Sequence, residues 1–442
     1  MSVDSYEQLV QALFPRLTGG IRWGLGRTRR MLASVGDPHR TFRSVHVGGT
    51  NGKGSVAATL ESVLRSAGQR TGLYTSPHLC TFRERIGIAG QPIGEEALLT
   101  AARRLWPAVE IERPSFFEAT TAIAFLALAE AGVEVAVIEV GLGGRLDATN
   151  VITPEIAIVT NVALDHVQFL GPTLASVAAE KAGIFKRGVP ALTAETEPEP
   201  LAVLRDAALR AGTSLDALQP DAVSIIASDI AGTHFRVRGT SWGEIEIRTP
   251  LLGAHQAVNG ALAVAALDRL PADLKPDYET LLHGIAAVDW PGRLQVERAR
   301  DRTWVFDVAH NVAGVQALSS ALATLPLPSP RILLMGVLGD KDWRNMLRPL
   351  YAVAEGAVLT RPPTAPVDRA WDPDIVLAEV PDPRAEAIPD FALAMDVAAR
   401  RAGPGGTVIV TGSFHTVGDT LAVLGRAPAG VDPGLPAPPI AA

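Results

Sequence analysis

A glycine-rich loop with one lysine and one serine is the segment of the sequence best suited to chemistry. Residues 45–67 read VHVGGTNGKGSVAATLESVLRSA, an apolar strand that runs through the loop into an amphipathic helix. Gly52 and Gly54 let the backbone turn tightly and bring its N–H groups close to a polyanion, and the helix N-terminus adds partial positive charge. Lys53 supplies a mobile full charge, and the Ser55 hydroxyl suits a phosphate-bound Mg²⁺. We therefore expect this loop to bind ATP.

The loop departs from the usual phosphate-binding pattern G-x-x-x-x-G-K-[ST]. Val47 stands where the first glycine belongs, and Gly54 separates Lys53 from Ser55. Taken alone, such a run could be an ordinary surface turn. Its context favours nucleotide binding, because the alternation before the loop predicts a strand and the apolar spacing after it predicts a helix.

Further polar groups follow the next predicted strands. Glu139 ends the strand VAVIEV before the turn GLGGR, where a carboxylate suits Mg²⁺. The turn is not a dinucleotide fingerprint, because Leu146 stands where the third glycine belongs. Asp165 and His166 end the following strand, and Lys181 lies on a later helix. These residue types alone leave structural roles open, since imidazole is an unexpected ligand for Mg²⁺ and a helical lysine is usually at the surface.

A third group of polar residues lies in the C-terminal part of the chain. Asp307 and His310 follow the strand WVFDVAHN, and Arg293 lies in DWPGRL, whose Trp-Pro-Gly break suits a hinge between domains. A nucleotide held by the loop of one domain and by these groups of another would lie in the cleft between them. Closure of the cleft would then gate the chemistry.

Composition limits the classes of protein that the chain can belong to. With 442 residues, of which 47% are hydrophobic and 20% charged, it can bury a large core in two or three domains. A net charge of −7 without a long Lys/Arg run argues against nucleic-acid binding. The absence of a long apolar run and of a leader peptide predicts a cytoplasmic protein that does not bind membranes, and the single cysteine, Cys80, agrees with a reducing compartment. We interpret two small basic clusters as solvated surface charge: Arg27, Arg29 and Arg30, and Arg83 with Arg85.

The order of predicted elements indicates an α/β fold. Strands and helices alternate from residue 45 to about 190, which predicts a parallel sheet buried on both faces, with ligands at the C-terminal ends of its strands. Residues from about 215 to 250 alternate like a small antiparallel ribbon. Four further strands between about 295 and 425 predict a second, smaller α/β unit. We expect domains at 1–290 and 291–425, followed by a disordered Pro/Ala-rich tail at 426–442.

Several blocks together resemble the folylpolyglutamate and dihydrofolate synthases of the Mur ligase superfamily. The blocks, in family order, are HVGGTNGKGS, LYTSPHLCTFRERIGIAGQPI, SFFEATTAIAF, VIEVGLGGRLDATNVITP, TNVALDHVQFLG, AAEKAGIFK, GAHQAVNGA, WPGRL, FDVAHN and GVLGDKDW. The resemblance implies an N-terminal P-loop ATPase domain with a mostly parallel sheet and a smaller C-terminal α/β domain. It also implies a monomer whose active site lies between the domains.

The resemblance also implies roles for single residues. The ATP phosphates would be held by Gly52, Lys53, Gly54 and Ser55, and other parts of the nucleotide by Asn259, Arg293, Asp307 and His310. Magnesium would bind Ser76, Glu139 and His166, with a second ion organised by Lys181 after its carbamylation by CO₂. Lys53, His166 and Lys181 would be the catalytic residues. The pterin contacts would be Arg27 and Thr28 in the stretch 25–28, then Ser115, Phe116, Phe117 and Glu118, and then Leu146, Asp147 and Ala148. The stretch 25–28 departs from the family pattern, and His415 receives no role.

The implied activity is that of an ATP-dependent, amide-forming ligase. Transfer of the γ-phosphoryl group would activate a carboxylate as an acyl phosphate, which the amine of L-glutamate then attacks. The acceptor would be dihydropteroate as well as reduced folate glutamates, so we expect a bifunctional enzyme. The alternatives are a folylpolyglutamate synthase only, another Mur-type ligase that adds amino acids to a cell-wall precursor, and a nucleotide-dependent binding protein. The LYTSPHL and SFFEATT blocks favour the folate branch, and the complete set of metal ligands argues against a binding protein.

Overall fold

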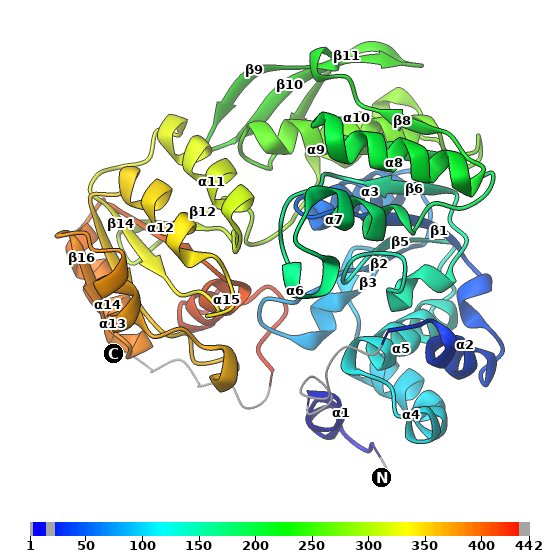
Figure 1. The fold of residues 1–442 in the computed structure, drawn as a ribbon, viewed down its shortest axis with the longest axis horizontal. Coiled ribbons are helices and arrows are strands. Elements are labelled where there is room, and N and C mark those ends of the chain that lie inside the picture. The colour runs from blue at the N-terminus through cyan, green and yellow to red at the C-terminus, as the bar shows by residue number, and fades with distance from the viewer. Residues whose placement is uncertain (1–2, 15–22, 433–442) are drawn as a thin grey trace.

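An eight-stranded sheet forms the centre of the N-terminal part of the chain (Figure 1). The structure, a computed structural model, describes residues 3–14 and 23–432. The strands are β1 (Arg43–Gly48), β2 (Thr71–Tyr74), β3 (Ile86–Ile88), β4 (Gln91–Pro92), β5 (Val135–Glu139), β6 (Ile156–Val159), β7 (Ala191–Thr193) and β8 (Leu215–Ala217). Their order is β4-β3-β2-β5-β1-β6-β7-β8, and the pairings are parallel except those of β2 with β3 and β3 with β4. The prediction of a mostly parallel sheet is confirmed.

Both faces of this sheet are covered by helices. Successive residues of β5 point to opposite faces, so Val135 and Val137 pack on one side and Ala136 and Ile138 on the other. The first side carries α3 (Lys53–Ser66), α9 (Ala254–Asp268) and α10 (Tyr278–Ala286). The second carries α1 (Tyr6–Leu13), α2 (Gly26–Ala33), α4 (Glu95–Glu112) and α5 (Phe116–Glu130). Helices α6 (Val167–Leu170), α7 (Leu174–Ala182) and α8 (Pro198–Ala211) follow β6 and β7.

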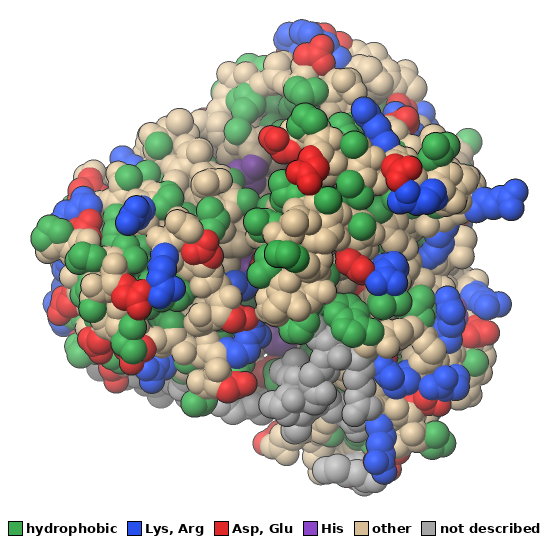
Figure 2. All heavy atoms as spheres, in the orientation of Figure 1, with side chains coloured by type: hydrophobic (Ala, Val, Ile, Leu, Met, Phe, Trp, Pro, Cys, Tyr) green, Lys and Arg blue, Asp and Glu red, His purple; other side chains and the backbone are tan. Residues whose placement is uncertain are grey.

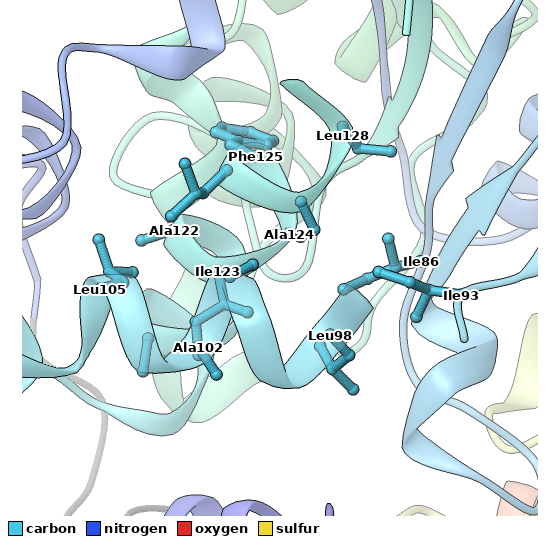
Figure 3. Close-up of a cluster of buried hydrophobic side chains, with 14 of the residues drawn as sticks. Ile86, Ile93, Leu98, Ala102, Leu105, Ala122, Ile123, Ala124, Phe125 and Leu128 are labelled. Atoms are coloured by element: carbon cyan, nitrogen blue, oxygen red, sulfur yellow. The ribbon is translucent and has the colours of Figure 1, made fainter. Parts of the chain in front are cut away.

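The SFFE block lies at the N-terminal end of α5, and α5 is held in place by packing against α4. Leu98, Ala102 and Leu105 of α4 lie beside Ile123 and other apolar residues of α5 (Figure 3). Ser115 caps the N-terminus of α5, because its side chain accepts a hydrogen bond from the Glu118 N–H, and Glu118 in turn bonds the Ser115 N–H at 2.8 Å. The start of α5 is therefore held at a defined position.

A three-stranded antiparallel sheet follows, as the alternation of residues 215–250 predicts. It consists of β9 (Val223–Asp229), β10 (Gly232–Thr240) and β11 (Gly243–Thr249). Phe235, Val237, Ile245 and Ile247 are buried against α9, and the opposite face is largely exposed. The sheet thus packs on the outside of α9 and α10 (Figure 1).

The C-terminal part of the chain contains a second α/β unit, on the left in Figure 1. Its strands are β12 (Gln295–Ala299), β13 (Arg302–Phe306), β14 (Arg331–Met335), β15 (Gly356–Leu359), β16 (Ala385–Ala387) and β17 (Thr407–Thr411), in the order β12-β13-β17-β14-β15-β16. Only β12 is antiparallel to its neighbour. The helices are α11 (Val312–Thr324), α12 (Trp343–Ala352), α13 (Pro373–Glu379), α14 (Phe391–Ala402) and α15 (Phe414–Val423). The four strands expected from the sequence are β13, β14, β15 and β17, so the edge strands β12 and β16 were missed.

The expectation of a disordered tail from residue 426 is wrong for its first residues. Asp432 is buried, and its carboxylate accepts hydrogen bonds from the Tyr6 hydroxyl, the Thr81 hydroxyl and the Phe82 N–H. Arg83 donates to the Ala429 carbonyl at 2.7 Å. We call residues 426–432 the C-terminal strap, because it runs from the end of α15 to the N-terminal part of the molecule. The rest of the expected tail, 433–442, lies outside the described residues.

Candidate active site

A cleft of about 470 Å³ lies between the two α/β units and is lined by both. Figure 2 shows histidine side chains in the furrow between the two halves. Twelve of the residues proposed from the sequence line this one cleft: Gly52, Lys53, Gly54, Ser55, Ser76, Glu139, His166, Lys181, Asn259, Arg293, Asp307 and His310. The structure therefore brings together residues that are spread over 259 positions of the chain.

The glycine-rich loop is folded so closely that side chains would not fit. Gly52 has a φ of 81°, and a Cβ there would lie 2.5 Å from Oδ1 of Asn259. A Cβ on Gly54 would lie 2.8 Å from the ring of Trp290, which belongs to the predicted hinge. Lys53 is the first residue of α3, and its ammonium group donates to the Thr50 carbonyl at 3.0 Å. The loop thus exposes backbone and one cation to the cleft.

Glu139 lies at the C-terminal end of β5, directly beside this loop. Its Oε2 accepts the Ser76 N–H at 3.1 Å, and its Oε1 is 3.9 Å from Nζ of Lys53. Burial raises the pKa of Glu139, while Lys53 and the Ser76 hydrogen bond lower it. A buried carboxylate facing a lysine and a serine is a suitable place for a hard cation.

Lys181 is a buried lysine that forms no ion pair with a carboxylate among the described residues. It lies on α7 and donates from Nζ to the Gly49 carbonyl at 2.8 Å. Burial, followed by the charge of Lys53, lowers the pKa of Lys181 to about 7. A substantial fraction of its amine is therefore neutral near pH 7. The residue types alone left the role of Lys181 open, and the structure shows that it is buried rather than at the surface.

Asp165 connects the two sides of the cleft. Its carboxylate receives Nζ of Lys341 at 2.6 Å and Nδ2 of Asn311 at 3.0 Å, and both donors belong to the C-terminal unit. Although burial raises the pKa of Asp165, Lys341 and the neighbouring histidines hold it well below its usual range. Burial, followed by the charge of Lys341, lowers the pKa of His166 to about 4, so this imidazole is neutral at pH 7.

A second pair of residues crosses the cleft beside Asp165. Asn51, in the glycine-rich loop, and Asn311 exchange side-chain hydrogen bonds of 3.0 and 3.2 Å. The sequence analysis assigned no role to Asn51, Asn311 or Lys341. The available signal was their place in the blocks HVGGTNGKGS, FDVAHN and GVLGDKDW.

The C-terminal side of the cleft is held together by backbone and ring contacts. Asp307 is buried, and its carboxylate accepts the N–H groups of Leu294 and Ala309, both at 2.9 Å. The guanidinium of Arg293 lies 5.2 Å from the ring centre of Phe414. Burial lowers the pKa of His310 to about 4. Asn259, opposite, donates to Gln256 at 3.0 Å.

Comparisons with known proteins agree with this geometry. A family model described as Mur ligase middle domain matches residues 47–267, and one described as Mur ligase, glutamate ligase domain matches residues 292–414. The Bacillus subtilis dihydrofolate synthase/folylpolyglutamate synthase is 36% identical over 361 residues, which cover 79% of this chain and 84% of the relative. The chain belongs to the folylpolyglutamate/dihydrofolate synthase family of Mur ligases. Membership identifies it as an ATP-dependent ligase.

Two solved structures of this family have the same fold as this ligase. Escherichia coli FolC in complex with DHPP and ADP is 30% identical, with a TM-score of 0.83 over 96% of this chain and 98% of that one. The Yersinia pestis bifunctional folylpolyglutamate synthase/dihydrofolate synthase with Mn, AMPPNP and L-glutamate bound is also 30% identical, with a TM-score of 0.81 over 94% and 98% of the two chains. Both comparisons cover nearly the whole ligase.

The proposed pterin residues of this ligase do not line the cleft but lie next to it. Phe117 packs against Gly141, a residue of the cleft wall. Arg27 forms an ion pair of 2.9 Å with Glu118. Asp147 is buried and caps a short 3₁₀ helix (Ala148–Val151) by accepting from the Thr149 N–H. Thr28 and Ala148 are buried as well, and Leu146 is half-buried.

Arg85 of this ligase corrects the interpretation of the second basic cluster. Its side chain is buried at 7% exposure, and its guanidinium lies 5.2 Å from the ring centre of Phe116. Arg83 is partly buried and bonds the carbonyls of Ile93 and Ala429. Neither is a solvated surface charge, which sequence composition alone did not reveal.

The donors around Glu139 fit a divalent cation bound with nucleotide phosphates. The Ser55 hydroxyl is buried and has no hydrogen-bond partner among the described residues, as expected of a group that awaits a ligand. Within residues 3–14 and 23–432 no three His, Cys, Asp or Glu side chains cluster as a metal site. The proposed set contains only Glu139 and His166 of these types, so phosphate oxygens and water would complete the coordination. No helix in the described part of the ligase is long and apolar enough to cross a membrane.

Proposed function

We propose that this ligase adds L-glutamate both to dihydropteroate and to reduced folate glutamates. The observation that carries the proposal is the cleft, where the glycine-rich loop and Glu139 face Arg293, Asp307 and His310, in a chain similar over most of its length to enzymes named for both activities. We assign residues 1–290 to the ATP-binding domain and 291–425 to the C-terminal domain. A monomer in the cytoplasm remains the prediction from the sequence.

The chemistry that the residues support begins with activation of a carboxylate. The N–H groups of the loop and the ammonium of Lys53 would hold the phosphates of ATP, while Asn259, Arg293, Asp307 and His310 would hold the rest of the nucleotide. The substrate carboxylate attacks the γ-phosphorus, so an acyl phosphate and ADP form. The amine of L-glutamate then attacks the acyl carbon, and phosphate leaves as the amide forms. Holding three substrates in one cleft supplies part of the acceleration.

Ser55, Ser76, Glu139 and His166 would hold Mg²⁺, which supplies charge neutralisation on the phosphates. His166 is neutral at pH 7, as a metal-ligating imidazole must be. We propose that Lys181 is carbamylated and contributes to a second magnesium site. Its lowered pKa supports this modification, because CO₂ reacts with a neutral amine. The resulting carbamate would replace a cation with an oxygen donor.

The pterin ring would lie beside Phe116 and Phe117, near the buried carboxylate of Asp147. Arg27, Thr28, Ser115 and Glu118 would form or support the wall of this pocket, with Leu146 and Ala148 on the same turn as Asp147. Phe117 borders the cleft wall at Gly141, which supports a substrate whose pterin end lies outside the cleft and whose carboxylate reaches into it.

Mass spectrometry of the products tests the proposal. The protein is incubated with Mg²⁺-ATP, L-glutamate and either dihydropteroate or tetrahydrofolate, and we expect one added glutamate in the first tube and one or more in the second. Addition to tetrahydrofolate alone would restrict the enzyme to folylpolyglutamate synthesis. No product from either acceptor, with ATP bound, would contradict the proposal and favour another Mur-type ligase.

A further inference from the structure

A buried carboxylate, Asp165, joins the two α/β units one residue before the proposed magnesium ligand His166. Its Oδ1 accepts Nζ of Lys341 at 2.6 Å and the backbone N–H of His166 at 2.8 Å, and its Oδ2 accepts Nδ2 of Asn311 at 3.0 Å. The side chains of Asp165 and Lys341 are each 9% exposed. Because protein donors occupy both oxygens, Asp165 is suited to anchor its neighbours rather than to bind a metal ion itself.

His166 has a backbone conformation that needs such an anchor. Its φ of 52° and ψ of 37° lie in the left-handed region, which a residue with a Cβ adopts at an energetic cost. The helix that follows, α6, has only four residues, and Val167 and Phe169 are exposed, so its burial contributes little to holding this turn. The orientation of the His166 imidazole therefore depends on the carboxylate that accepts the N–H of the same residue.

Lys341 holds this carboxylate from the C-terminal unit. It lies in the turn before α12, where its N–H donates to the Leu338 carbonyl at 3.1 Å and its carbonyl accepts the Trp343 N–H at 2.9 Å. The second donor from this unit, Asn311, is the N-cap of α11. The contact of Lys341 is the stronger of the two, because both of its partners are charged. Movement of the C-terminal unit away from the N-terminal unit would withdraw both donors.

We propose that Lys341 is a positioning residue for the metal site and acts through Asp165 on His166. This inference rests on the proposed function, in which His166 is a ligand of Mg²⁺. When the two units are together, Lys341 fixes Asp165, and Asp165 fixes the turn that presents the imidazole. When they separate, the carboxylate loses its cation and the strained turn relaxes. Metal affinity therefore depends on closure of the cleft, although the proposed metal ligands all belong to the N-terminal unit.

Binding of Mn²⁺ in the presence of AMPPNP tests this inference without turnover. Free Mn²⁺ is measured by electron paramagnetic resonance. Lys341→Met removes the charge and keeps most of the apolar chain, so it should weaken Mn²⁺ binding about 10- to 100-fold, the usual effect of losing a group that orients a metal ligand. Affinity for AMPPNP in EDTA should change by less than about threefold. Asp340→Asn, on the same turn, loses an ion pair with Arg369 inside the C-terminal unit and is the matched control.

Substitution of His166 shows whether Lys341 acts through this residue. Once His166→Ala has removed the imidazole, adding Lys341→Met should weaken Mn²⁺ binding by less than about twofold more. An undiminished loss in that background, or an unchanged Mn²⁺ affinity in Lys341→Met alone, would overturn the inference. An unchanged Mn²⁺ affinity together with a raised KM for L-glutamate would show that Lys341 contacts the substrate instead.

A double substitution separates this role from misfolding. Lys341→Met leaves the Asp165 carboxylate buried without its cation, which is destabilising in itself. Asp165→Asn combined with Lys341→Met removes both charges and keeps an oxygen for the His166 N–H. We expect this variant to unfold at close to the original temperature but to bind Mn²⁺ about tenfold more weakly, because nothing fixes the carboxamide from across the cleft. Recovery of Mn²⁺ affinity together with stability would overturn the inference. Failure of the unaltered protein to ligate either acceptor would contradict the proposed function instead, while the Mn²⁺ comparison would still decide the role of Lys341.

Discussion

Burial determines the charge of single side chains around the cleft. Lys181, His166 and His310 all have lowered pKa values because their charged forms are desolvated. Asp165 is the exception, since Lys341 keeps it ionised although burial acts in the opposite direction. The neutral imidazoles and the partly neutral lysine therefore have lone pairs available near pH 7, while Lys53 and Arg293 contribute positive charge to the lining of the cleft.

Substitution of Lys53 tests the proposed role of the glycine-rich loop in binding phosphate. Lys53→Met keeps the length of the chain but removes the only positive charge of the loop, so we expect kcat to fall by about 10²- to 10³-fold, the usual loss for one donor to developing charge. The measurement is ADP release with dihydropteroate. Lys275→Met, which affects a lysine paired with Asp268 away from the cleft, serves as the control. Comparable losses in both variants would contradict the assignment.

Ionisation of a single buried residue, Asp419 on α15, should make the free energy of unfolding depend on pH. Burial raises its pKa from 3.8 to about 6, although the Thr364 N–H and hydroxyl oppose the shift. The folded state therefore holds more protons than the unfolded state between about pH 4 and pH 6, so stability falls as pH rises through this window. Asp419→Asn keeps the acceptor for Thr364 and removes the ionisation. Between pH 4 and pH 7 the unaltered protein should lose about 2 kcal/mol of unfolding free energy relative to this variant. Urea unfolding of both proteins checks this, and parallel pH profiles would contradict it.

At the scale of elements, the glycine-rich loop depends on the close approach of α9 to the start of α3. Gly52→Ala would force a side chain into φ 81° and into contact with Asn259, whereas Gly68→Ala meets a similar φ of 84° with nothing within 4 Å. We expect Gly68→Ala to cost about 1 kcal/mol of stability through strain alone. Gly52→Ala should in addition weaken ATP binding at least about tenfold, because the loop must move away from α9. Equal ATP affinity in the two variants, measured by calorimetry, would contradict this account.

The elements that the sequence predicted are those with a strong pattern and a buried position. Strands β5 and β6 are nearly continuous apolar runs, β1 alternates polar and apolar residues, and the loop after β1 carries the glycine and lysine signal, so the meeting of this loop with the ends of the strands could be predicted from the sequence. The edge strands β4, β12 and β16 are short or half-exposed and carry no such pattern. Arg85 and Lys341 were missed for another reason. Their burial arises from elements distant in sequence, which residue types and spacing do not encode.

At the scale of the whole molecule, two kinds of contact join the halves. Within the cleft, Lys341 and Asn311 donate hydrogen bonds to Asp165, and Asn311 also donates to Asn51, so this first group of contacts lies beside the glycine-rich loop. Outside the cleft, Gly418 of α15 packs so closely on the segment after Ser76 that a Cβ would lie 2.1 Å from the Leu79 carbonyl. The C-terminal strap then continues along the same segment to Asp432.

The C-terminal strap should therefore stabilise the segment that carries Ser76. Asp432→Ala leaves the Tyr6 and Thr81 hydroxyls and the Phe82 N–H without their acceptor, which should cost about 2 to 3 kcal/mol of unfolding free energy. Amide hydrogen exchange should accelerate at residues 79–82. The Phe82 N–H donates to the Asp432 carboxylate, and the Asp432 N–H donates to the Cys80 carbonyl, so loss of the carboxylate weakens the attachment of the C-terminal strap to this segment. Val431→Ala is the control, since the Val431 side chain is 40% exposed. Unchanged exchange at 79–82 in Asp432→Ala would show that α15 alone holds this segment, and the strap would then have no part in positioning Ser76.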